Sequence, residues 1–507
     1  MSRFVQQTNW SRGEIEPRLL GRQDAEFYDS AAELLDNWLP DTVSSISVRA
    51  SFQSLLKIPL TIVGPEDQTL LLRRSFQNLL GYVFRGVQVV VHLALYFDED
   101  TEESYLAIRA YRIALERLDT DSPRVLAADI AGGGFYLSPP IVDPDPAILY
   151  EVGFSVAGPA AFLTHRLFPP VRVFPDSLDP TAASFNVSTP VFYRELFGFV
   201  TPQAGTNDWE GSEEAIFDEQ LEVGDTIKFR NQLYTVASIT VSTDEETEGQ
   251  QSFTTVETYT GETLTDRVDV LDPDPFGGNP SLVAFYQGRL VLAATDEQPT
   301  GVWLSRSGDP FTIVPSSVDD GSPINQELFA EGADEFVWMT GGDRLYLGSG
   351  LGEYALGSPD ETLTPTQLRF FRIGQNGGAR VTPVVVDGTV IFANRSRSQV
   401  LGVVYDLARQ SFSTNNLSIL SGHLTQGVLD LTYRPPVEND RTPRIFALTP
   451  DGLRAFALSE AAGVAAWNRI SHSPAFTIKA VAGTSEYLFA ICNRNSGYVD
   501  LAVLRNE

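Results

Sequence analysis

Recurring pairs of short apolar runs fill the second half of the 507-residue sequence. Leu282–Ala293 predicts a strand, a Gln-Gly turn and a second strand, and similar units follow at intervals of roughly 45–55 residues. The later units centre on Asp343–Gly348, Asp387–Phe392, Arg444–Ala457 and Glu486–Ala490. This spacing suits β-propeller blades, which take about 40–50 residues each. We therefore predict a β-propeller-like portion over residues 275–507, although a pair of β-sandwiches would give similar local signals.

The composition also favours strands over helices. Aromatic residues reach 11%, and 40 glycines and 31 prolines supply the turns that short strands need. The chain has no run of 18 apolar residues, so we expect no membrane insertion. Its single cysteine, Cys492, excludes an intrachain disulfide and fits assembly in a reducing cytoplasm. The predicted fold class is mainly β.

A short N-terminal helical segment is predicted beside the strands. Between Asp24 and Trp38, apolar residues recur every three or four positions, which is the spacing of an amphipathic helix that Pro40 would end. The stripe consists of Ala25, Tyr28, Ala32, Leu35 and Trp38. Farther along, Tyr105–Leu118 fits a helix or a strand equally well.

Four regions are expected from these patterns. Residues 1–60 form an N-terminal assembly arm and helix, and residues 61–204 form a β-rich platform. Residues 205–274 form a small inserted β domain, since two alternating runs are joined there by an Arg230-Asn231 turn. Residues 275–507 form the propeller-like hairpin repeats.

The sequence contains no recognisable catalytic, metal or cofactor motif, and we predict a protein that is not an enzyme. The four histidines are scattered and no Cys/His cluster exists, which argues against a zinc site. Gly348–Gly352 superficially resembles a phosphate-binding loop, but a hairpin pattern follows where a helix would be needed. The acidic run Asp98–Glu103 has oxygen donors for a cation, yet it lacks the glycine and terminal glutamate of an EF-hand loop. We interpret it as a solvated loop.

Several motifs resemble one protein family. The first is Asn9-Trp-Ser-Arg-Gly-Glu-Ile-Glu-Pro, followed by Gly21-Arg-Gln-Asp24, Tyr28 and Asn37. Others follow along the chain: Leu163–Pro170, Phe285–Ala294, Val302–Asp309, Leu347–Tyr354, Thr364–Thr366, His423–Thr425 and Trp467. In this order they are similar to the nozzle (tail tubular B, or stabilisation) proteins of short-tailed bacteriophages. The family's Gly-Gly and Arg-Arg-Pro-Gly stretch is missing from residues 40–58.

The resemblance implies a structural role in a virion tail. Such proteins form a ring, usually a homohexamer, below the portal and the tail adaptor ring, with fibres or spikes attached nearby. The ring extends and closes the conduit for genomic DNA, then opens for ejection. DNA would pass transiently and without stable nucleic-acid binding.

The resemblance and the charge together nominate two sets of residues. The polar N-terminal arm has little core of its own to join and is a candidate assembly contact: Asn9, Arg12, Glu14, Arg18, Arg22 and Asp24. The net charge of −30 suggests an acidic tube along which DNA slides, because phosphates find no cations there. Candidate lumen or gate residues are Asp98, Glu99, Asp100, Glu102, Glu103, Asp244, Glu245, Glu246 and Glu248.

Two alternatives stay open at this point. A tail-associated glycan-binding or depolymerising protein could also combine a propeller with exposed aromatic residues. A propeller scaffold for protein interactions, unrelated to phage, would have the same repeats.

Overall fold

The chain is mainly β and is built from many small sheets. The computed structural model describes residues 9–19, 30–40, 46–48, 52–65, 67–117, 125–141, 144, 146–179, 184–212, 217–242, 250–329, 334–357, 362–406, 411–437, 442–459 and 462–504. Within these ranges the one α-helix is the short α1 (Phe217–Gln220). Short 3-10 turns occur at Pro17–Leu19, Pro146–Glu151 and Gly422–Leu424.

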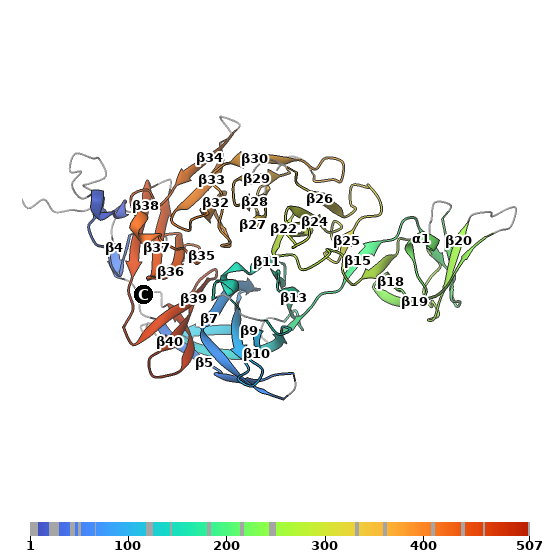
Figure 1. Cartoon of the computed structure of the whole chain (residues 1–507), viewed down its shortest axis with the longest axis horizontal. Coiled ribbons are helices and arrows are strands. Elements are labelled where there is room, and N and C mark those ends of the chain that lie inside the picture. The colour runs from blue at the N-terminus through green and yellow to red at the C-terminus, as the bar shows by residue number, and fades with distance from the viewer. Residues whose placement is uncertain are drawn as a thin grey trace, which may run out of the picture.

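Seven sheets follow one another along the chain (Figure 1), and antiparallel pairs of strands close together in sequence form most of each. The first sheet contains β6 (Thr61–Val63), β7 (Thr69–Phe84), β8 (Val87–Phe97), β9 (Ser104–Arg117) and β10 (Val125–Leu137). The second contains β11 (Gly153–Ala157), β12 (Ala160–His165), β13 (Phe168–Pro175) and β14 (Phe185–Ser188). The third contains β22 (Leu282–Tyr286), β23 (Arg289–Ala293), β24 (Gly301–Leu304) and β26 (Ile324–Glu327). The fourth sheet contains β27 (Phe336–Gly341), β28 (Leu345–Ser349), β29 (Glu353–Leu356) and β30 (Phe370–Gly374). The fifth contains β31 (Val384–Val386), β32 (Thr389–Ala393), β33 (Val400–Asp406) and β34 (Ser411–Asn416).

The last two sheets take in strands from the N-terminal part of the chain. The sixth contains β35 (Asp430–Arg434), β36 (Arg444–Thr449), β37 (Gly452–Ser459) and β38 (Val464–Ile470), extended by β1 (Gly13–Glu14) and β2 (Ala31–Ala32). The seventh contains β39 (Phe476–Gly483), β40 (Leu488–Arg494), β41 (Val499–Leu504) and β5 (Phe52–Ile58). Between these additions, β3 (Trp38–Pro40) pairs with β4 (Ile46–Val48).

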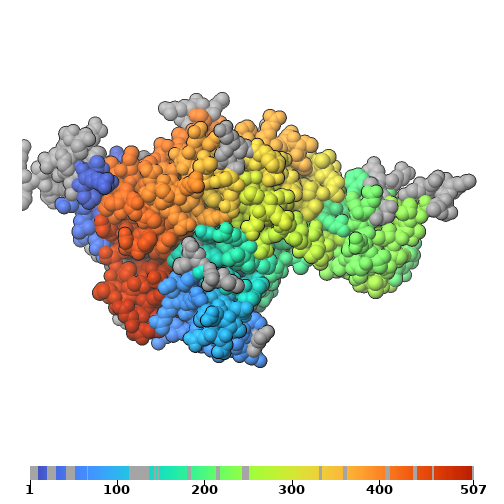
Figure 2. Space-filling view, viewed as in Figure 1, coloured from blue at the N-terminus to red at the C-terminus, as the bar shows by residue number. Residues whose placement is uncertain are grey.

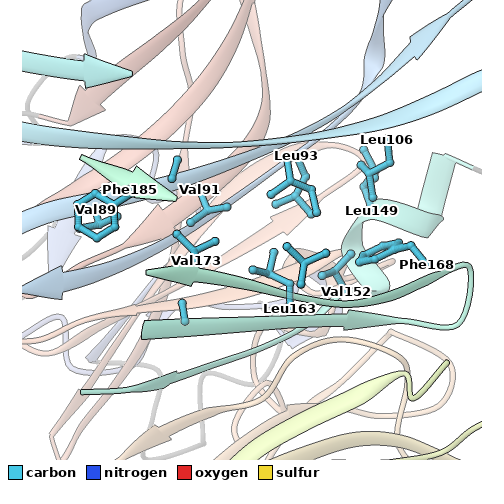
Figure 3. Close-up of a cluster of buried hydrophobic side chains, with 14 of the residues drawn as sticks. Val89, Val91, Leu93, Leu106, Leu149, Val152, Leu163, Phe168, Val173 and Phe185 are labelled. Carbon is cyan, nitrogen blue, oxygen red and sulfur yellow. The ribbon is translucent and has the colours of Figure 1, made fainter. Parts of the chain in front are cut away.

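Each sheet shares a buried apolar cluster with the next, and the seventh shares one with the first. Figure 3 shows the first of these interfaces, where Val91 and Leu93 of β8 face Leu163 and Val173 of the second sheet. Val90, whose side chain points to the other face of β8, joins the cluster shared with the seventh sheet. Because β8 is buried on both faces, apolar residues occupy its odd and even positions alike, with Gln88 and His92 as the polar exceptions. The packing therefore forms a closed cycle.

One further sheet lies between the second and third sheets in sequence and projects from the body (Figures 1 and 2). It contains β15 (Phe192–Glu195), β16 (Val200–Pro202), β17 (Asp208–Gly211), β18 (Thr226–Phe229), β19 (Gln232–Val241), β20 (Gln251–Thr255) and β21 (Asp269–Asp272), and β25 (Thr312–Val314) pairs with its β15 edge. We call residues 192–272 the projecting domain. Its core is aromatic, with Trp209 stacked on Phe253 and fully buried.

The predicted N-terminal helix is wrong in its described part, residues 30–38. Ala32 and Leu35 are buried as the apolar stripe required, but the segment forms β2 and reaches β3 in an irregular path. Its backbone bonds to distant strands: Ile15 N–H donates to Ala32 O and Arg469 N–H donates to Leu35 O. These tertiary bonds outweigh the local helical periodicity. The ambiguous segment from Tyr105 is a strand, because β8 and β10 pair with β9 on either side.

Candidate functional site

The N-terminal motif packs onto the sixth sheet through Gly13 and Glu14. Gly13 has a φ of +66°, and a Cβ at this position would lie 2.5 Å from the backbone N and O of Trp467. Only glycine permits both this conformation and this close approach. β1 can therefore pair in parallel with β38, which places the next residue, Glu14, inside the molecule.

Glu14 is fully buried and accepts hydrogen bonds from three directions. His423 Nε2 lies 2.9 Å from Oε1, Arg469 Nε lies 2.8 Å from Oε1, and the Leu35 N–H lies 3.0 Å from Oε2. Burial raises the pKa of Glu14, but the bonds from His423, Leu35 and Arg469 outweigh it, and the net pKa is lowered. The carboxylate is thus held charged, and it ties the N-terminal motif to two distant parts of the chain.

The structure separates the predicted assembly-contact residues. Asn9, Arg12 and Arg18 are exposed on the N-terminal segment. Glu14 is an internal residue instead of a surface contact, because its partners lie within the same chain. Arg22 and Asp24 lie outside the described residues.

A second charged network joins the projecting domain to the third sheet. Glu195 of β15 and Asp269 of β21 are directly paired across their strands, and both are nearly buried. Arg306, just after β24, bridges them: Nη2 lies 3.0 Å from Glu195 Oε1 and Nη1 lies 2.9 Å from Asp269 Oδ2. Thr312 Oγ1 donates to Asp269 Oδ2 at 3.0 Å. We call these four residues the joint network.

The electrostatics of the joint network depend on Arg306. Two carboxylates on directly opposite positions of a strand pair repel each other unless a cation lies between them. Burial raises the pKa of Asp269, and Arg306 and Thr312 only partly offset this effect. Beside the network, Lys228 of the projecting domain pairs with Asp309 at 3.2 Å. The domain is therefore fixed to the body by specific charged contacts.

Other motif residues also hold loops of the body together. Arg289 is almost fully buried, and its Nη1 donates to the carbonyl oxygens of Ser305 and Ser322 at 2.7 and 2.6 Å. His165 is buried beside Phe168, and desolvation lowers its pKa to about 3. The imidazole is consequently neutral at physiological pH, which suits a packing role.

The sequence identified Arg306 and Asp309 only as part of a motif and did not identify Glu195 or Asp269. A signal was nevertheless present. Asp269 stands between Val268 and Val270 in an otherwise apolar run, where a charge is expected to be buried and paired.

The first predicted acidic loop is the turn between β8 and β9. Asp98 is almost buried and caps the turn, since the Asp100 N–H donates to its Oδ1 at 3.0 Å. Glu99, Asp100 and Glu102 are exposed, while Glu103 Oε2 accepts a 2.7 Å bond from the Tyr105 hydroxyl. The other predicted acids, Asp244, Glu245, Glu246 and Glu248, lie outside the described residues. Three acids of the first loop can therefore face a solvent-filled space.

An isolated carboxylate lies on β35, the first strand of the sixth sheet. Asp430 is nearly buried, and Oδ1 accepts a 2.8 Å bond from the Leu431 N–H. Desolvation raises the pKa of Asp430 to about 7. The buried group is therefore partly protonated near neutral pH.

Two further properties of the described residues bear on function. No group of three or more His, Cys, Asp or Glu in these ranges is arranged to hold a metal ion. Among the same residues, no helix has the length and apolar character needed to span a membrane.

Comparisons with known proteins give no family. No family model matches the chain, and no curated protein matches it. Among solved structures, a chain of "Crystal Structure of Mitotic Checkpoint Complex" is similar at 9% identity and a TM-score of 0.34, over 90% of this chain and 92% of that one. An auxiliary nutrient binding protein from Bacteroides ovatus ATCC 8483 is similar at 10% identity and a TM-score of 0.28, over 85% and 98%. Both TM-scores are below 0.5, so these likenesses carry no argument.

Proposed function

We propose that this chain is a structural subunit of a short-tailed bacteriophage tail nozzle, and that its cycle of seven sheets is a β-propeller. The observation that supports the proposal most is the meeting of distant motif residues at Glu14. The N-terminal motif supplies Gly13 and Glu14, and the later motifs supply His423 and Trp467. Residues that resemble one family in sequence order are thus also partners in space, as expected if a shared fold underlies the resemblance.

The proposed work of the subunit is to form a ring that conducts and gates DNA and anchors neighbouring tail proteins. A homohexamer would carry 180 negative charges at −30 per subunit. Charge of this sign repels phosphate over a Debye length of about 8 Å at physiological salt. In this proposal, exposed acids such as Glu99, Asp100 and Glu102 line the tube or its gate, so that DNA passes without binding.

The experiment is electron cryomicroscopy of virions in which this chain carries a tag. Density for the tag in a ring on the tail axis supports the nozzle proposal, and the residues placed in the same map show whether acidic or basic side chains line the tube. Tag density confined to peripheral appendages rejects the proposal in favour of the glycan-binding alternative. A lumen lined mainly by basic residues rejects the acidic-tube part alone.

A further inference from the structure

The projecting domain presents an apolar sheet face to solvent. Leu233 and Val256 are 54% and 64% exposed, and both lie beside Thr235: Leu233 is two residues away on β19, and the Val256 N–H donates to Thr235 O. Tyr234 and Thr255, the alternating neighbours, are buried on the opposite face. We call Leu233 and Val256 the domain face; Val223 of the same domain is also exposed. An exposed apolar sheet face of this kind indicates an interaction surface.

Acidic residues flank the domain face, and its one basic cross-strand neighbour, Lys228 opposite Leu233, is paired with Asp309 of the body. Glu257 accepts bonds from the Thr235 N–H and hydroxyl at 2.6 and 3.1 Å, and Glu222 and Asp225 flank Val223. Residues 192–272 contain 18 acidic and four basic residues, a net charge of −14 within a chain of −30. The four basic residues all lie within ion-pair distance of carboxylates. The surface that a partner meets is therefore apolar with a strongly negative rim.

A surface of opposite character lies on β30, the outermost strand of the fourth sheet. Phe371 and Leu351 are 49% and 47% exposed, and Arg369 and Arg372 are exposed beside them. Arg372 is held against Leu351, because its Nη2 donates to Leu351 O at 3.2 Å. Residues 362–386 contain three arginines and no acidic residue, and of the three Arg380 is paired with Glu335. We call Leu351, Arg369, Phe371 and Arg372 the β30 face.

We infer that the domain face of one subunit binds the β30 face of a second copy of this chain. Apolar groups on both sides supply burial, and opposite rim charges select the pairing. Two domain faces would instead place two net charges of −14 against each other. In Figure 1 β19 lies in the projecting domain and β30 in the body, so the contact joins unlike surfaces. A contact of that type repeats from copy to copy and closes into a ring when its rotation permits.

This inference builds on the proposed ring but is tested separately, on the purified full-length chain. Molar mass is measured by light scattering over a concentration series for the wild type and two variants. The first, Leu233→Ser with Val256→Ser, alters the domain face, and the second, Arg369→Glu with Arg372→Glu, alters the β30 face. Each variant alone is expected to raise the dissociation constant of self-association about tenfold or more. The first loses apolar contacts at the centre of the interface, and the second loses the attraction between opposite charges. An equimolar mixture of the two is expected to form dimers, because each variant retains one intact face.

Two control variants test whether any loss of self-association is specific to the two faces. Val63→Ser and Arg85→Glu change similar exposed residues elsewhere and should leave the molar mass unchanged. Near-UV circular dichroism checks folding, and Arg369→Glu alone carries the test if Arg372→Glu unfolds the protein. A wild type that stays monomeric at the highest concentration, a face variant that assembles normally, or a mixture without dimers overturns the inference. A chain found off the tail axis in virions would reject the nozzle proposal without affecting this result.

Discussion

Glu14 forms hydrogen bonds with His423 and Arg469, which lie 409 and 455 positions after it in the sequence. A single carboxylate can do this because burial strengthens its bonds, and the same burial makes the loss of either side costly. Gly13 is equally necessary, since a side chain there would collide with the backbone of Trp467. At the scale of residues, the N-terminal motif therefore makes stabilising contacts within its own chain.

Replacing Glu14 with Ala should lower the free energy of unfolding by about 3 kcal/mol, because Arg469 and His423 lose their buried partner. Urea denaturation at pH 7 measures the change. Glu16→Ala is the matched control: Glu16 pairs with Arg18, whose side chain is 90% exposed, and the expected change is below about 0.5 kcal/mol. Equal effects of the two substitutions would contradict this stabilising role of Glu14.

Asp430 should make stability depend on pH. Its pKa of about 7 in the folded state lies above the ordinary 3.8, so the folded chain binds a proton that the unfolded chain releases. The stabilising contribution is complete below pH 3.8 and is lost as pH rises to about 7. Asp430→Asn, which stays neutral, should flatten this loss and be more stable than the wild type at pH 8 by over about 1 kcal/mol. Unfolding free energies at pH 5, 6, 7 and 8 provide the test; parallel pH profiles would exclude the role.

At the scale of elements, strands were more predictable than the N-terminal segment. Val87–Phe97 is apolar except for Gln88 and His92, so burial between two neighbouring sheets is largely readable from the sequence. The segment Ser30–Pro40 has a helical stripe, but its backbone partners are β1 and β38. No local pattern encodes a partner more than 400 residues away, which is why both the helix and the internal role of Glu14 were mispredicted.

We expect the joint network to stabilise the strands β15 and β21, through which the projecting domain is attached to the body. Arg306→Lys keeps the positive charge but cannot bridge Glu195 and Asp269 with a planar fork of donors. We expect faster amide hydrogen exchange in β15 and β21, and about 2 kcal/mol less stability of these strands. Arg230→Lys is the control, since Arg230 and Asp266 are about half exposed. Unchanged exchange in β15 and β21 would show that packing alone fixes the domain.

At the scale of the whole molecule, hairpin units predicted the mainly β class but not how the sheets close. The last sheet lacks an outer strand of its own and takes β5 from the N-terminal part of the chain. Leu56 pairs with Leu501, and Ile58 joins the cluster shared by the seventh and first sheets. The sequence of β5 mixes apolar residues with Gln53, Ser54 and Lys57, and the identity of its partner depends on the three-dimensional arrangement of all seven sheets.

Two truncations separate closure of the cycle from the contacts of the N-terminal motif. Removing residues 1–40 deletes β1, β2 and β3 but retains β5. Removing residues 1–58 deletes β5 as well. The second truncation exposes one side of the cluster around Ile58 and leaves β41 as an open edge, so it should be less stable than the first by at least about 3 kcal/mol and prone to aggregation. Urea denaturation and hydrogen exchange of Val499–Leu504 measure this difference. Equal stability and equal protection of β41 would mean that β5 is not what closes the cycle, since the two truncated chains differ only in residues 41–58.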